Sequence, residues 1–238
     1  MGHTNSRDRG LLPFRVWQFF NAMQTAAAAR KPADFLCAAG ILSHYVGDAC
    51  QPLHGSVYAD GYKDRPTETV HHRRETGDEY TTVSNEGAGV HSAYESKMVD
   101  RHAAELIQAI QAKVNALTNL AAPSSGQKAA VATVALMDRS AKTIPPTHLV
   151  DSYVAAGGTP KVAVIDALWA DYGEATAKVM ADGARVLAAI WDGAWAAGNG
   201  NSIPASSLAE IAAAKLQTLY EDENFVTSLD LDNIGPEL

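Results

Sequence analysis

Apolar residues recur every three to four positions along most of the chain, which is the period of an α-helix packed by one face against a core. Proline residues mark two helix ends, because Pro13 suits a first helical turn and the residue before Pro52 is biased away from the helical conformation. The pattern predicts helices over about residues 13–30, 33–50, 90–120, 127–142, 161–197 and 205–223. No strand pair or repeat is recognised, so we expect an all-α fold.

Residues 55–88 interrupt the helical pattern with scattered glycines and charged side chains. We expect a long, irregular, polar loop there, and a loop of that length inside a compact domain is more often functional than accidental. Two shorter irregular segments are also expected: a connection between Pro145-Pro146 and Gly157-Gly158, and a tail over 224–238.

The composition is that of a globular protein: 238 residues, 47% of them hydrophobic and 19% charged. This length can bury a core, and we expect residues 1–238 to form a single helical domain. The net charge of -8 disfavours binding to a polyanion through a basic surface, although a bound cation would reverse the local field. No apolar stretch is long enough to span a membrane, and no secretory signal is recognised, so stable membrane insertion is not expected.

The chain has two cysteines, Cys37 and Cys50, which both fall in the second predicted helix. Thirteen residues of helix would separate them by about 20 Å, whereas a disulfide needs Cα atoms within about 7 Å. We therefore expect two free thiols.

Two short segments each pair a histidine with a carboxylate four residues later: His44 with Asp48, and His91 with Glu95. Residues at this spacing share one face of a helix, with Cβ atoms about 5–6 Å apart. His54 follows a proline, where the chain turns, and could reach the same cluster from another direction. A single His-x-x-x-Asp pair is common on helices that bind no metal. Two pairs and a third histidine favour a metal site, and imidazole with carboxylate suits zinc.

The first segment, His44-Tyr45-Val46-Gly47-Asp48 followed by Gln51-Pro52-Leu53-His54, resembles the zinc-dependent phospholipase C / S1-P1 nuclease superfamily. The segment from Gly89 to Glu95 is similar to the second helical zinc pair of that family, and Leu12-Pro13-Phe14 to its bacterial phospholipase C members. The likeness covers about residues 1–120. It implies a multi-helix domain that holds up to three zinc ions and cleaves phosphate esters.

The resemblance implies a role for six residues. His54, His91 and Glu95 match the ligands of one zinc, and His44 and Asp48 match ligands of a second, with Asp48 bridging to a third. His3 matches a further histidine of the second zinc. Among these, Asp48 and Glu95 are the expected catalytic carboxylates. One to two zinc ions are expected from the ligands present.

The N-terminus departs from the family pattern. Family members begin with a tryptophan whose amino group helps to hold the third zinc, and they carry an aspartate upstream of the histidine that His3 matches. Neither has room before His3. We therefore expect the chain to lack the N-terminal part of a longer protein, secreted or periplasmic by the resemblance, and its activity to be reduced.

The expected function is zinc-dependent hydrolysis of a phosphodiester by metal-activated water. The substrate is left open between a phospholipid head group and single-stranded nucleic acid. For the second, Tyr58, Tyr62 and Tyr80 are candidates to stack on unpaired bases. The alternative is a truncated or degenerate member of the family that binds metal or a partner without turnover.

Overall fold

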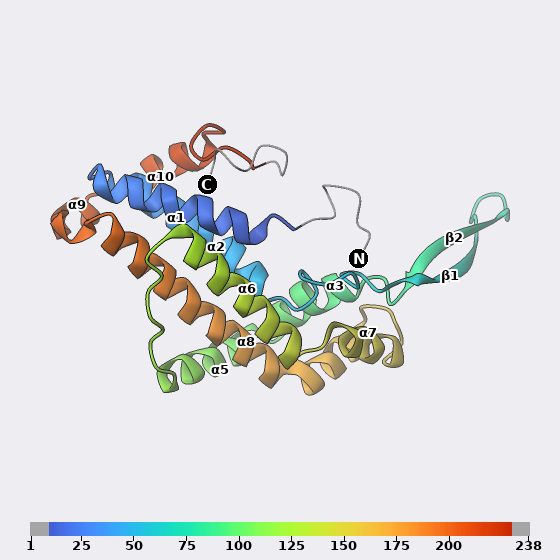
Figure 1. Cartoon of the computed structure of the whole chain (residues 1–238). Coiled ribbons are helices and arrows are strands. Elements are labelled where there is room, and N and C mark those ends of the chain that lie inside the picture. The colour runs from blue at the N-terminus through green and yellow to red at the C-terminus, as the bar shows by residue number, and fades with distance from the viewer. Residues whose placement is uncertain (1–9, 230–238) are drawn as a thin grey trace. The chain divides into compact units, whose positions relative to one another are not determined.

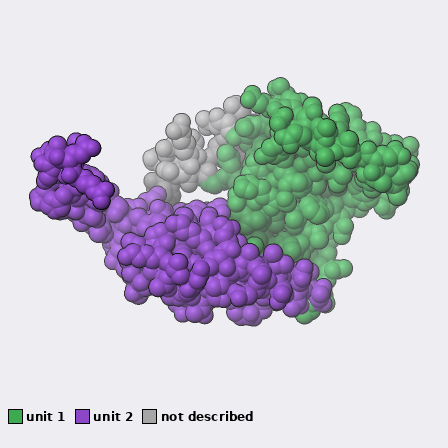
Figure 2. Space-filling model, turned by 180° about the vertical axis from the view of Figure 1, so that it is seen from behind, with its two compact units in different colours: residues 1–50, 116–138, 180–238 green, residues 51–115, 139–179 purple. Residues whose placement is uncertain are grey.

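The computed structural model describes residues 10–229. The described chain is mostly helical with one two-stranded sheet (Figure 1). It divides into two compact units, coloured separately in Figure 2: unit 1 is residues 1–50, 116–138 and 180–238, and unit 2 is residues 51–115 and 139–179. The division falls within two helices, α6 (Gly126–Thr143) and α8 (Val162–Ala197), so each of them contributes one part to each unit. The prediction of a single domain stays a prediction.

Unit 1 is built around the antiparallel neighbours α1 and α2. Its elements are α1 (Leu12–Ala28), α2 (Pro32–Cys50), the 3-10 turn η3 (Gly200–Ser202), α9 (Ala205–Ala209), α10 (Ala213–Glu221) and parts of α6 and α8. The apolar stripes of α1 and α2 pack on each other and on α6 and α8 residues such as Leu136 and Ile190. Arg15 and Gln18 of α1 also hold the chain after α10, donating to the carbonyl oxygen of Thr227 at 2.7 and 3.0 Å.

The contact between α2 and α8 depends on a glycine. A Cβ atom at Gly183 would overlap the Sγ atom of Cys50. Both cysteines are buried free thiols, which confirms that prediction. Burial, with the nearby charges of Asp182 and Asp48, raises the pKa of Cys50 to about 12.

Unit 2 carries the sheet and a run of short helical segments. Its elements are β1 (Tyr62–His72), β2 (Glu79–Glu86), α3 (Val90–Ser92), the π-helical segment η2 (Ala93–Met98), α4 (Val99–Arg101), α5 (Ala103–Ala116), α7 (Pro146–Ala155) and the remaining parts of α6 and α8. Its core forms where the segment from Val90 to Met98 packs on α7 and α8, with Leu149, Tyr153 and Leu168 fully buried.

Strands β1 and β2 form an antiparallel hairpin in which Thr69 lies opposite Thr82 and His72 opposite Glu79. The hairpin extends beyond α3 and α7 of its own unit (Figure 1), and nearly all of its side chains are exposed. Its base is anchored by Tyr62, which is buried and donates its hydroxyl to Oδ1 of Asp151 at 2.7 Å.

The expectation of an irregular loop over residues 55–88 is therefore wrong for the hairpin. Because both faces of the ribbon are exposed, its strands show no alternation of apolar and polar residues, and alternation is the signal that predicts a strand. The described fold is mainly helical, which is roughly consistent with the expected all-α class, and it adds one small two-stranded sheet.

The helix boundaries agree with the prediction except in three places. The expected connection after Pro145-Pro146 contains the helix α7, because Pro146 occupies a first-turn position where proline is tolerated. The helix expected over 205–223 is split into α9 and α10, and the one over 90–120 is divided at η2 and at His102 and ends at Ala116. Among the described residues, no helix is long and apolar enough to cross a membrane.

Candidate metal centre

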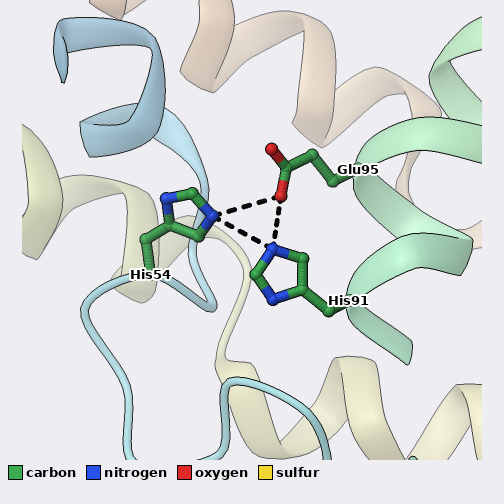
Figure 3. A group of neighbouring side chains, drawn as sticks. All are labelled: His54, His91 and Glu95. Atoms are coloured by element: carbon green, nitrogen blue, oxygen red, sulfur yellow. Dashed lines mark hydrogen bonds and ion pairs between the residues drawn. The ribbon is translucent and has the colours of Figure 1, made fainter. Parts of the chain in front are cut away.

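Three of the predicted ligands, His54, His91 and Glu95, converge in unit 2 (Figure 3). Nε2 of His54 lies 3.1 Å from Nε2 of His91 and 3.1 Å from Oε2 of Glu95. Nε2 of His91 lies 2.6 Å from the same oxygen. Each residue therefore turns one ligand atom toward a common point.

His54 is placed by the turn that ends α2. Pro52 cannot continue the helix, and the chain reverses so that the backbone N–H of His54 donates to the carbonyl oxygen of Gln51 at 3.2 Å. Leu53 is fully buried and anchors this turn in the core of unit 2. His54 therefore follows directly after an anchored residue, and the His54 side chain is 20% exposed.

His91 and Glu95 are placed by a capped helical start. Gly89 adopts a φ of 92°, and the carboxylate of Asp60 accepts the backbone N–H groups of Gly89 and His91 at 2.8 and 3.4 Å. A carboxylate at a helix N-terminus satisfies otherwise unpaired N–H groups and complements the helix dipole. Glu95 then falls in the π-helical segment η2, a rare conformation that occurs frequently at functional sites.

Packing beneath this helical start leaves little space for a side chain at residue 89. A Cβ atom on Gly89 would lie 3.0 Å from the hydroxyl oxygen of Tyr153, which is fully buried. Burial, with the nearby charge of Asp60, raises the pKa of this phenol. The position that begins the helix of His91 thus favours glycine because of its positive φ, and the tight contact with Tyr153 adds to that preference.

The electrostatics of the cluster favour an ionised Glu95. Partial burial acts to raise its pKa, but the hydrogen bond from Gln51 and the charges of His54 and His91 outweigh burial, so the pKa lies below its usual value. An ionised carboxylate is the form that coordinates a metal ion. The side chains of His91 and Glu95 are 36% and 38% exposed, so the cluster is open to solvent on one side.

The spacing of the ligand atoms fits a small tetrahedral ion. Zn–N bonds of ~2.0–2.1 Å at tetrahedral angles put ligand atoms ~3.3 Å apart. Two of the observed separations, 3.1 and 3.1 Å, fall about 0.2 Å short of that value, and the third, 2.6 Å between His91 and Glu95, falls about 0.7 Å short. A small outward adjustment of side chains that are already partly exposed would accommodate the ion.

The other predicted ligands lie elsewhere in the chain. His44 and Asp48 face each other on α2 in unit 1, with Nε2 of His44 3.5 Å from Oδ2 of Asp48, and the His44 side chain is 74% exposed. The convergence of this pair with His91 and Glu95 on one pocket stays a prediction, as does the catalytic role of Asp48. His3 lies outside the described residues.

Two residues that position the ligands were missed in the sequence analysis. Gln51 donates to Glu95, and Asp60 caps the helix of His91. Gln51 stands beside Pro52 at a recognisable helix end, so its place in a turn could have been found. Asp60 is 29 residues from Gly89, and no local spacing links the two.

The comparisons with known proteins overturn the family assignment. No family model matches the chain, and no solved structure matches it. A protein of Bradyrhizobium tropiciagri named a probable serine protease is 45% identical over 238 residues, which cover 99% of this chain and 30% of that protein. The chain thus spans about a third of the curated relative it matches.

The resemblance to the phospholipase C / S1-P1 nuclease superfamily is therefore wrong, and so is the predicted zinc-dependent phosphodiesterase activity on phospholipid or nucleic acid. The alternative, a member of that superfamily without turnover, has no better support. The motifs indicated the wrong family because a histidine and a carboxylate four residues apart allow any helix to present two metal ligands on one face. Such a pair defines a local geometry and not a fold.

Proposed function

We propose that His54, His91 and Glu95 bind one divalent cation, and that zinc is the ion that suits them best. The observation that carries this proposal is the convergence of three ligand atoms, all within 4.8 Å of one another, from segments 37 residues apart in sequence. His91 and Glu95 come from a capped helical start, and His54 comes from the turn after a helix that ends at a proline. Two segments distant in sequence thus deliver ligands to one point.

The donor set selects the ion. Two imidazole nitrogens and one carboxylate oxygen suit zinc, whereas calcium and magnesium take mostly or entirely oxygen ligands. Copper competes for such a site by intrinsic affinity, since the Irving–Williams order places it above zinc. The tetrahedral edge lengths calculated above favour zinc over an ion that needs a square-planar arrangement.

The site has three protein ligands and a solvent-exposed side, which leaves a coordination position open. Structural zinc sites usually close the fourth position with a protein ligand, and catalytic sites keep it for water or substrate. A zinc ion bound there would acidify a water molecule and polarise a carbonyl group. To bind the ion, the two imidazoles must offer a nitrogen lone pair and the carboxylate must be ionised.

A direct titration tests the proposal. The chain is freed of metal with a chelator, and zinc binding is measured by competition with a chromophoric chelator. We expect one zinc per chain, and at least a 100-fold loss of affinity in His91→Ala. His72→Gln is the matched control, because His72 is an exposed histidine of the hairpin. Equal affinity in His91→Ala and the parent chain would refute the assignment.

A second candidate, peptide-bond hydrolysis, is favoured by the name of the relative, which matches nearly the whole chain. The hydroxyls of Ser56 and Ser152 have partners other than imidazole: Ser56 accepts from the Tyr58 N–H, and Ser152 bonds to Tyr172. A fluorescent casein assay with two inhibitors separates the chemistries. Cleavage stopped by a serine-directed phosphonate favours a serine nucleophile, and cleavage stopped by a chelator favours the metal site.

A further inference from the structure

We propose that Gln51 is a positioning residue for the metal site, setting both the imidazole of His54 and the carboxylate of Glu95 before the cation arrives. This inference rests on the proposed metal site and adds a residue that does not itself touch the ion. It is carried by three hydrogen bonds made by one side chain and its own carbonyl group, all within unit 2.

The first two bonds build the turn that carries His54. The side-chain oxygen of Gln51 accepts the backbone N–H of Leu53 at 2.6 Å, and its backbone oxygen accepts the backbone N–H of His54 at 3.2 Å. Pro52 has no N–H to offer. Gln51 thus accepts the first two N–H groups that follow it, and it closes the turn without help from another segment.

The hydrogen bond from the Leu53 N–H also settles the orientation of the Gln51 side-chain amide. Because Oε1 accepts from a backbone N–H, the other end of the amide must be the NH₂ group. That group lies 3.1 Å from Oε2 of Glu95 and donates to it. The orientation is therefore imposed by the turn, and the donor is aimed at the carboxylate before any ligand binds.

The third bond restricts how Glu95 can coordinate. Oε2 is the oxygen that faces both imidazoles, and it is also the oxygen that Gln51 holds. One of its lone pairs is taken by the amide, and the other is left toward the two Nε2 atoms. The carboxylate is thereby held from rotating away, and we infer coordination through Oε2 alone.

Gln51 also links two parts of the chain. It lies 44 residues before Glu95, so the bond ties the turn of His54 to the helical segment of His91 and Glu95. Ordering both segments in advance removes part of the entropy cost of binding, and outer residues of this kind typically change metal affinity by about 10–100-fold.

The test compares zinc affinity in the chain and in Gln51→Met, which keeps the size of the side chain and removes the side-chain bonds. We expect a loss of about 10–100-fold. Gln108→Met is the matched control, because Gln108 is an exposed glutamine of α5 in the same unit, and it should leave the affinity unchanged. Equal affinity in Gln51→Met and the parent chain would overturn the inference.

A double-mutant cycle separates positioning from general loosening of the fold. If Gln51 acts through the ligands, Gln51→Met costs less in a Glu95→Ala background than in the parent chain, since one of its targets is gone. The same fold-loss in both backgrounds would show that it does not act through Glu95 and would contradict the inference.

A measurement without metal keeps this inference distinct from the proposed function. Hydrogen exchange of the Leu53 amide in the metal-free chain should be at least tenfold faster in Gln51→Met, because its acceptor is lost. If the parent chain binds zinc and Gln51→Met binds equally well, only the positioning role fails. If the parent chain binds no zinc, the metal site itself fails, whatever the exchange rates show.

Discussion

Oε2 of Glu95 lies 2.6 Å from Nε2 of His91, one turn earlier in the same helical segment. The same oxygen lies 3.1 Å from Nε2 of His54, which comes from the turn after α2. Two imidazoles thus share a single carboxylate oxygen on a partly exposed surface. A cation placed among these three atoms would replace the contacts between them with bonds to itself.

Zinc should stabilise the chain against heat. A ligand that binds only the folded state at about 100 times its dissociation constant adds about 2.7 kcal/mol. For a protein of this size that corresponds to a rise in Tm of roughly 5–10 °C. Differential scanning fluorimetry with zinc, and with magnesium as control, measures it. A shift that persists in His91→Ala would show that the stabilising zinc is bound elsewhere.

The lowered pKa of Glu95 predicts a pH-dependent contribution to stability in the metal-free chain. Its folded pKa lies below the ordinary value of 4.5, so the ionised form is favoured by folding. The contribution is fully present above that value and is lost as the pH falls through the folded pKa. Urea unfolding in chelator should show a stability gap between the parent chain and Glu95→Gln at pH 6 that closes as the pH falls from 4.5 through the folded pKa of Glu95. A stability gap that widens toward acid pH would show that folding raises the pKa of Glu95 and would contradict the prediction.

The hydrogen bond from Tyr62 to Asp151 should anchor the hairpin. Removing the hydroxyl in Tyr62→Phe removes this hydrogen bond at a cost of about 0.5–1.5 kcal/mol, because Asp151 is exposed and water can replace the donor. Burial, and then the bond to Asp151, raises the pKa of Tyr62 to about 12. Its stabilising effect is therefore present below pH 10 and is lost between pH 10 and 12. Absorbance titration should show one fewer late-ionising tyrosine in Tyr62→Phe. An unchanged titration would mean that another tyrosine accounts for the late step.

The contact between Gly183 and Cys50 predicts that Gly183→Ala destabilises the chain, although glycine to alanine normally stabilises a helix. Alanine normally improves on glycine inside a helix by about 1 kcal/mol. At position 183 its Cβ would overlap Sγ of Cys50, so Gly183→Ala should destabilise the chain by about 1–3 kcal/mol. In a Cys50→Ala background the overlap is gone, and the same substitution should be neutral or stabilising. Urea unfolding of the four variants measures this, and additive effects would rule out the contact.

The sequence was most informative where side chains pack on one side. The stripes of α1 and α2 face a core, so the 3.6-residue period located both helices within two residues of their observed ends. The hairpin was missed because Val70 and Val83 are its only aliphatic side chains and both are exposed. Its pairing rests on backbone hydrogen bonds between residues 7 to 24 positions apart, and these bonds do not depend on a pattern of side chains.

The candidate site was partly predictable for the same reason. His91 and Glu95 lie four residues apart on one segment, and that spacing alone places them together. His54 was expected to approach the His44 and Asp48 pair from another direction because a proline ends α2, and in the structure it lies beside His91 and Glu95. The contacts of Gln51 and Asp60 join segments 44 and 29 residues apart, and they depend on the tertiary fold. The spacing of ligands did not identify the family, because unrelated folds can present the same ligand pair.

The most direct test of the metal site is X-ray anomalous scattering at the zinc edge from crystals grown with one equivalent of zinc. We expect a single strong peak within about 2.2 Å of Nε2 of His54, Nε2 of His91 and Oε2 of Glu95. A zinc peak bound only to other residues, with the Glu95 carboxylate still in contact with the two imidazoles, would contradict the account.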